Sequence, residues 1–160
     1  MDERVEAAMN RQIQAELASA YLYLSMSAHF ASEGLSGFAH WMRQQSEEEK
    51  DHAMRFFDHV VDRGGRVALE AIDQPPTKFG TPLEIFEQVL EHEREVTAAI
   101  HALYELVAEA KDHASQPLLL GFITEQIEEE KTATELVEQI GLVGAEKAQL
   151  LFLDRELAKR

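Results

Sequence analysis

Residues 38–65 read FAHWMRQQSEEEKDHAMRFFDHVVDRGG, and this segment combines a helical stripe with two metal-ligand side chains. Its apolar positions recur at alternating intervals of three and four residues, as in a helix that buries one face. Glu49 and His52 fall on that stripe, three residues apart, so both side chains point from the same face. Gly64 and Gly65 then favour the left-handed conformation that ends a helix.

Three other long stretches have the same spacing, and punctuation by glycine and proline separates them. We predict that Ser36 caps the second helix, that Thr81 and Pro82 begin the third, and that Ser115 begins the fourth. The predicted helices cover residues 3–32, 36–64, 81–111, 115–141 and 145–159. Their inward stripes are Met9, Ile13, Glu16, Ala20, Tyr23, Ser27, Phe30; Phe38, Met42, Gln45, Glu49, His52, Phe56, Val60; Phe86, Val89, Glu93, Val96, Ile100, Leu103, Val107; and Leu119, Phe122, Gln126, Glu129, Ala133, Leu136, Ile140.

Loop lengths predict how these helices are connected. Short loops join the first helix to the second and the third to the fourth, so each pair forms an antiparallel hairpin. The segment 64–81 contains Pro75, Pro76 and Gly80, and it is long enough to run the length of the bundle. We therefore predict an all-α, up-down-down-up four-helix bundle with one long crossover and a short fifth C-terminal helix. One domain is expected over residues 1–160, with the bundle in 1–142 and the fifth helix in 143–160.

Polar side chains interrupt all four stripes near their middle. Glu16 precedes Glu49 by 33 residues, and Glu93 precedes Gln126 by the same interval. The set Glu16, Glu49 and His52 recurs 77 residues later as Glu93, Gln126 and Glu129. Buried carboxylates need a partner, and a bound cation would serve all of them. The spacing predicts a two-metal site with pseudo-twofold symmetry, for Fe(II) or Mn(II) with Zn(II) as a competitor. The alternative is a set of surface acids on helices whose phase differs by one residue.

Composition narrows the classes of function. The chain has 160 residues and a net charge of −15, which disfavours nucleic acids and anionic membranes as partners. It has no cysteine, so disulfides, iron–sulfur clusters and cysteine nucleophiles are excluded. The N-terminus lacks the apolar run of a signal peptide, and no window is apolar enough to span a membrane. A cytoplasmic location is expected.

With these features together, the chain resembles the non-haem ferritins of bacteria and archaea. The resemblance covers essentially the whole chain and rests on NRQIQAELASAYLYLSM (10–26), GFAHWMRQQSEEEKDHAMRFFDHVVDRGGRV (37–67), EHEREVT (91–97), TEQIEEEK (124–131) and LLFLDREL (150–157). It implies a ferritin-like fold, Fe(II) oxidation by O2 or peroxide, and storage of ferric oxide in a shell of 24 identical subunits. The fifth helix is then expected to pack around a symmetry axis, which would cover its apolar residues Leu142, Val143, Leu150, Leu151 and Leu153.

The resemblance also assigns roles to residues. One ferroxidase iron would bind Glu16, Glu49 and His52. The second would bind Glu49, Glu93 and Glu129, with Gln126 beside it. Tyr23 is similar to the family tyrosine next to this centre, and a third iron would fall on Glu48, Glu125 and Glu128 together with Glu129.

Departures from related families refine the prediction. Bacterioferritins carry a histidine where this chain has Glu129, and their haem-ligating methionine corresponds to Lys50. Haem is therefore not expected. Gly121 occupies a position where many bacterial ferritins have tryptophan, so no aromatic electron donor is expected there. Among the other histidines, His92 is the best candidate for a role at the site, because it adjoins Glu93.

Two alternatives to iron storage remain open. A di-iron oxygenase or peroxidase on the same bundle would need a substrate pocket beside the metals, where Phe56 and Val96 are large enough to fill the space. A purely structural bundle would tolerate loss of Glu49 and His52 without a change in iron uptake.

Overall fold

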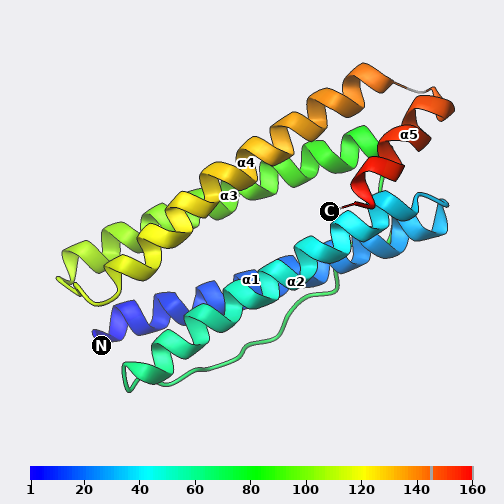
Figure 1. Cartoon of the computed structure of the whole chain (residues 1–160). Coiled ribbons are helices and arrows are strands. Elements are labelled where there is room, and N and C mark those ends of the chain that lie inside the picture. The colour runs from blue at the N-terminus through cyan, green and yellow to red at the C-terminus, as the bar shows by residue number, and fades with distance from the viewer. Residues whose placement is uncertain (145, 160) are drawn as a thin grey trace.

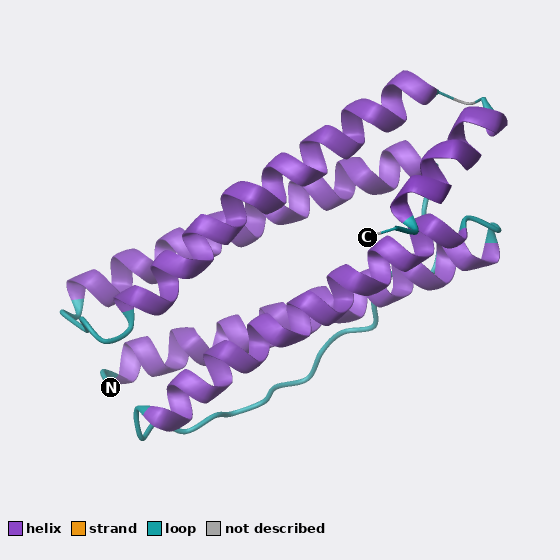
Figure 2. Cartoon of the chain, viewed as in Figure 1, coloured by secondary structure: helices purple, strands orange, loops and turns teal. Residues whose placement is uncertain are grey.

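The structure is a computed structural model that describes residues 1–144 and 146–159, and within this range the regular elements are all α-helices (Figures 1 and 2). They are α1 (Glu3–Ser32), α2 (Ser36–Asp62), α3 (Pro82–Glu109), α4 (Gln116–Val143) and α5 (Lys147–Leu157). The all-α prediction is confirmed. Helices α3 and α4 end within two residues of their predicted ends. The predicted start of the fifth helix at Ala145 lies outside the described residues.

The bundle consists of two antiparallel hairpins, α1 with α2 and α3 with α4 (Figure 1). The crossover between α2 and α3 runs along the first hairpin, so α2 and α3 point in the same direction. This is the predicted up-down-down-up order. Helix α5 lies across one end of the bundle and contacts α2 and α4. No described helix is both long and apolar enough to cross a lipid bilayer.

Polar side chains of α1 hold the crossover in place. Asn10, Gln14 and Ser25 bond backbone groups between residues 66 and 76 at 2.6–3.0 Å. These bonds satisfy peptide groups that no helix or sheet would otherwise pair. The long connection is therefore fixed along its length.

The helix starts follow the sequence only in part. Thr81 caps α3 in a reciprocal capping box with Glu84, and Pro82 occupies the first helical turn, as predicted. The prediction for Ser36 is wrong, because Ser36 is the first residue of α2 and the cap position, Leu35, makes no side-chain bond. Ser115 is at the cap position of α4, but its hydroxyl does not cap the helix. That hydroxyl donates to Asp112 at 2.9 Å and lies 2.8 Å from the ring of His59.

A carboxylate from α5 caps α2 in place of Ser36. Asp154 accepts hydrogen bonds from the backbone amides of Gly37 and Phe38 at 2.8 and 2.9 Å, and it is buried. A carboxylate at this end of a helix also interacts favourably with the helix dipole. The two backbones approach so closely that a Cβ on Gly37 would lie 1.6 Å from the carbonyl oxygen of Asp154. Glycine at position 37 is thus required for α5 to dock.

We expect Gly37→Ala to lower the free energy of unfolding by about 3 kcal/mol, because the methyl group forces α5 away and uncaps α2. Urea denaturation followed by circular dichroism measures the change. Gly141→Ala is the matched control, since Gly141 is also helical and a Cβ there meets no atom within 4 Å. That control should be neutral or up to about 1 kcal/mol stabilising. Equal effects of the two substitutions would contradict the account of α5 docking.

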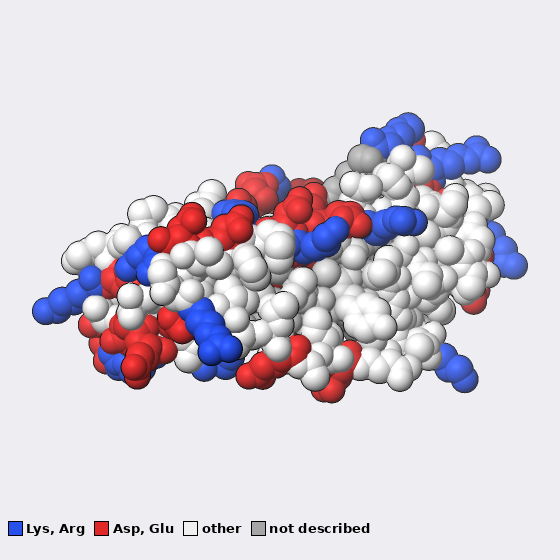
Figure 3. Space-filling model, turned by 90° about the horizontal axis from the view of Figure 1, so that it is seen from below, with Lys and Arg blue, Asp and Glu red and all other residues white. Residues whose placement is uncertain are grey.

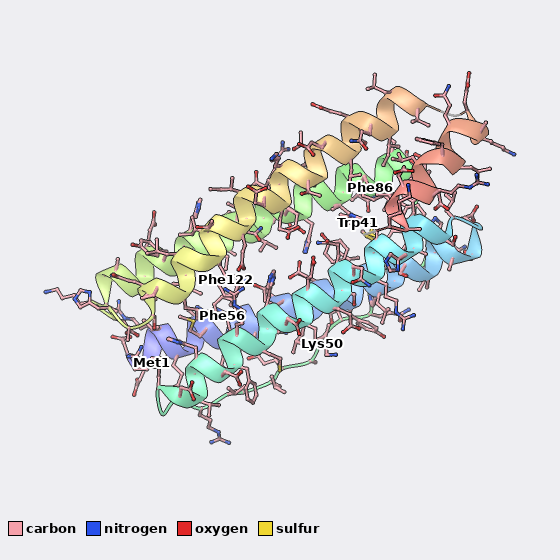
Figure 4. All side chains as sticks on the ribbon, in the orientation of Figure 1. Met1, Trp41, Lys50, Phe56, Phe86 and Phe122 are labelled. Atoms are coloured by element: carbon pink, nitrogen blue, oxygen red, sulfur yellow. The ribbon has the colours of Figure 1, made fainter. Side chains whose placement is uncertain are left out.

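The core consists of two apolar clusters at opposite ends of the bundle. Phe56 and Phe122 stack in one, with ring centroids 4.4 Å apart, and Trp41 packs on Phe86 in the other at 5.1 Å (Figure 4). The predicted stripe residues are all buried except His52, Val96 and Glu129, which are half-buried. Of the apolar residues predicted for the fifth helix, Leu153 lies in α5 and is buried against its own chain, whereas Leu142 belongs to the end of α4 and is 87% exposed. Between the two clusters lies the polar level of the stripes.

Candidate metal centre

Three ligand-type side chains of the first hairpin converge at this polar level. Helix α1 supplies Glu16, and one turn of α2 supplies Glu49 and His52. One carboxylate oxygen from each glutamate and a ring nitrogen of His52 lie within 4.8 Å of one another. Glu16 and Glu49 are 1% and 4% exposed. Glu16, Glu49 and His52, all within the described part of the chain, thus have the side-chain chemistry and the spacing of a metal-binding site.

The second hairpin adds Glu93 from α3 and Gln126 from α4. Both side chains are buried, and the Gln126 amide donates to the Glu93 carboxylate at 3.2 Å. Tyr23 of α1 donates its hydroxyl hydrogen to the same carboxylate. Glu129 of α4 accepts a bond of 3.3 Å from the amide of Gln45. The side chains that donate to Glu93 and Glu129 in these bonds, Tyr23, Gln126 and Gln45, are neutral.

Burial of several acidic side chains close together raises their pKa values, because the ionised forms are poorly solvated there. Burial raises the pKa of Glu49 to about 8, and the nearby carboxylates of Glu93 and Glu129 add to the effect. Burial, followed by the charge of Glu49, raises the pKa of Glu16 well above its ordinary value. Burial and the charge of Glu93 likewise raise the pKa of Tyr23. With its pKa raised to about 8, Glu49 favours the protonated form at neutral pH when no cation is bound.

An unpartnered atom shows that the donor set suits a metal ion. Oε2 of Glu16 is buried and has no hydrogen-bond partner, and the same is true of Oε1 of Gln45. Buried polar atoms in native proteins are rarely left in this state. A proton shared with Glu49, or a cation, would satisfy Glu16. Carboxylate oxygens with one imidazole suit Fe(II) or Mn(II).

At the predicted third iron position, two of the acidic side chains lie close to basic side chains of the protein. Glu125 forms an ion pair with Arg55 at 2.6 Å, and the Arg55 guanidinium lies 4.0 Å from the centroid of the Phe122 ring. The side chain of Glu128 is 69% exposed and lies 3.9 Å from Lys131. The structure does not bring Glu48, Glu125, Glu128 and Glu129 together as a group of the kind formed by Glu16, Glu49 and His52.

Arg55 was not predicted from the sequence to lie at the centre. It lies three residues after His52, on the same side of α2, and this spacing was a usable signal. Its partner Glu125 is also 3.7 Å from the His52 ring. A Cβ on Gly121 would lie 3.3 Å from the Arg55 guanidinium, so a large residue at position 121 would displace it.

The remaining candidates lie beside the centre or outside it. His92 bonds Ser19 at 2.9 Å, and its ring packs edge-on against Tyr23, so it contacts the surroundings of the site and is not among the converging ligands. Lys50 has a side chain that is 60% exposed and pairs with Glu47, and it lies on the outer side of α2 (Figure 4).

A four-helix bundle with one long crossover, and with carboxylates from all four helices at one level, is the arrangement found in the class of ferritin-like bundle proteins. Comparison with known proteins places the chain within that class. Residues 6–143 match the ferritin-like domain of the ferritin family, and the chain belongs to that family.

Known relatives match this chain over its full length. It is 48% identical to a bacterial non-heme ferritin of Bacteroides fragilis, over 100% of this chain and 99% of the relative. It is 33% identical to a bacterial non-heme ferritin of Staphylococcus epidermidis, over 100% and 96%. A solved open-pore ferritin from the archaeon Archaeoglobus fulgidus superposes with a TM-score of 0.98 at 50% identity, covering 100% of this chain and 98% of that one. The predicted resemblance to non-haem ferritins is confirmed.

Proposed function

We propose that this protein stores iron and oxidises Fe(II) to Fe(III) at the centre formed by Glu16, Glu49 and His52. The observation that carries the proposal is the convergence of ligand atoms from these three side chains, together with a buried Glu16 oxygen to which no protein N–H or hydroxyl group donates. Membership of the ferritin family supports iron storage. Iron is here the substrate and the stored cargo.

Two Fe(II) ions would occupy the site together. Glu16, Glu49 and His52 would bind one, and Glu49, Glu93 and Glu129 the other, so that Glu49 bridges them. Gln126 holds the Glu93 carboxylate by its amide. Hard oxygen ligands favour Fe(III) over Fe(II), so binding here favours oxidation. Each Fe(II) gives up one electron, and one O2 takes both electrons and two protons to form H2O2. When H2O2 is the oxidant, it takes two electrons and two protons to form two water molecules.

Tyr23 would act beside this centre. Its hydroxyl is fully buried and bonded to Glu93, which orients one carboxylate of the second iron position. The raised pKa keeps the phenol protonated, so it remains a donor at neutral pH. We assign Tyr23 to positioning Glu93 during iron binding.

Storage requires an enclosure, and we propose a homo-oligomeric shell of 24 subunits in the cytoplasm. The single chain acts as one domain in this assembly. Acidic side chains gather in patches on the face shown in Figure 3, and acidic residues outnumber basic ones by 30 to 15. Such a surface attracts cations. A third iron at Glu48, Glu125, Glu128 and Glu129 would have to displace Arg55 from Glu125.

The test is an anaerobic Fe(II) titration followed by exposure to air. We expect two Fe(II) ions per subunit to bind, then a transient diferric absorbance, then a mineral core visible by electron microscopy in particles of shell size. Size-exclusion chromatography with light scattering measures the assembly. Iron that oxidises no faster than in buffer, with no core, would contradict storage. A small oligomer that oxidises iron without storing it would favour the oxygenase alternative.

A further inference from the structure

Gln12 lies one helical turn before Glu16 and contacts it directly. The Gln12 amide nitrogen donates to Oε1 of Glu16 at 2.9 Å. Gln12 is 6% exposed and Glu16 is 1% exposed, so water competes little for this bond. A bond between two buried groups on one helix restricts how the carboxylate can rotate.

The two oxygens of Glu16 are therefore unlike. Oε1 accepts a hydrogen bond from Gln12, whereas no protein N–H or hydroxyl group donates to Oε2, so its partner is a proton shared with the Glu49 carboxyl or a bound cation. A neutral amide fixes the carboxylate without adding a charge that would repel a cation. We propose that Gln12 is a positioning residue, which holds Oε1 of Glu16 so that Oε2 is presented to the incoming metal ion. This inference rests on the proposed function.

The surroundings of Gln12 indicate why an amide of this length is needed. A groove of about 330 Å³ runs between α1 and α3, and its lining includes Gln12, Ser19 and His92. Gln12 therefore lies between the groove and the buried Glu16. Truncation to alanine would remove the bond and also enlarge the groove toward the site. Methionine has nearly the same length and volume but no N–H donor, so Gln12→Met tests the bond separately.

A second glutamine provides a matched comparison. Gln45 of α2 is 2% exposed and donates its amide to Glu129 at 3.3 Å. Gln45→Met therefore removes an equally buried amide from a different carboxylate. A general effect of placing methionine in the core would be the same for both variants, whereas a positioning effect would differ between the two metal positions.

The experiment is an anaerobic titration of the assembled wild-type and variant proteins with Co(II), read by its visible absorption bands and by calorimetry. In the wild type we expect two Co(II) ions per subunit. Gln12→Met should weaken binding at the position shared by Glu16, Glu49 and His52 by at least about 10-fold and alter its absorption bands. Gln45→Met should leave that position within about threefold of wild type. Thermal unfolding of the metal-free proteins shows whether each variant is folded. Gln12→Glu serves as a second variant at this position. It keeps the length of the side chain but places a second acid beside Glu16.

The outcomes separate this proposal from the proposed function. A wild type that binds no Co(II) at these ligands would overturn the two-metal centre itself. If the wild type binds two ions and the folded Gln12 variants bind both with unchanged affinity and spectrum, the centre stands and the role of Gln12 is refuted. Equal weakening by Gln12→Met and Gln45→Met at both positions would also refute it.

Discussion

Glu49→Gln is expected to slow Fe(II) oxidation by at least about 100-fold, since we propose that the Glu49 carboxylate bridges both iron positions and a neutral amide is a much weaker ligand for each. The amide keeps the size of the side chain and can still bond His52, which lies 3.3 Å from Glu49. Stopped-flow absorbance after mixing with Fe(II) in air measures the rate. The same substitution should stabilise the metal-free protein at neutral pH, because it removes a buried acid from beside Glu16.

Glu47→Gln is the control for this experiment. Glu47 is on the same helix, its side chain is 61% exposed, and it pairs with Lys50. Its replacement should leave the oxidation rate unchanged. Oxidation in Glu49→Gln at more than a tenth of the wild-type rate would show that the centre described here is not where iron reacts.

The metal-free protein is expected to lose stability as the pH rises from about 4.5 to about 8. The pKa of Glu49 is near 4.5 in the unfolded chain and about 8 in the folded one. Between these values the folded state binds more protons than the unfolded state, so raising the pH favours unfolding. One such group contributes roughly 1.4 kcal/mol per pH unit within the window. Glu16, whose pKa is also raised, acts in the same direction.

Urea denaturation across this pH range measures the effect, with and without a divalent cation. The double variant Glu16→Gln, Glu49→Gln should show a much flatter dependence, because both buried acids are gone. A saturating divalent cation should also flatten the curve for the wild type, since the metal replaces the proton. Identical slopes for wild type and double variant would show that the dependence arises from the net charge of the surface.

The sequence was sufficient to predict the bundle, its connectivity and the polar level within it. The helices and their polar level follow from the three- and four-residue spacing of buried positions, as around Glu49 and His52. The connectivity follows from the lengths of the loops. The convergence of Glu16 with this pair could be anticipated from the repeated 33-residue interval. Metal binding and the role of each ligand remain predictions.

Features that depend on contacts distant in sequence were not predicted. Asp154 caps α2 across 117 residues, and no local pattern around Ser36 indicates that a distant carboxylate takes its place. The pairing of Arg55 with Glu125 likewise requires α2 and α4 to be packed at a known rotation. Gln12 was visible in the sequence, but only the packed structure shows that its amide meets one oxygen of Glu16 and leaves the other without a partner.

The division of the bundle into two hairpins has a consequence for how the chain could be cut. Each hairpin carries part of the ligand set that we propose, with Glu16, Glu49 and His52 on the first and Glu93, Gln126 and Glu129 on the second. The crossover that joins them is bonded to α1 up to residue 76. A break after that point would leave two fragments, each with its own helix pair and an incomplete chelating set. Both apolar clusters contain residues of both hairpins, so such fragments would reassemble through apolar burial, and a metal ion bound between the two halves would strengthen their association.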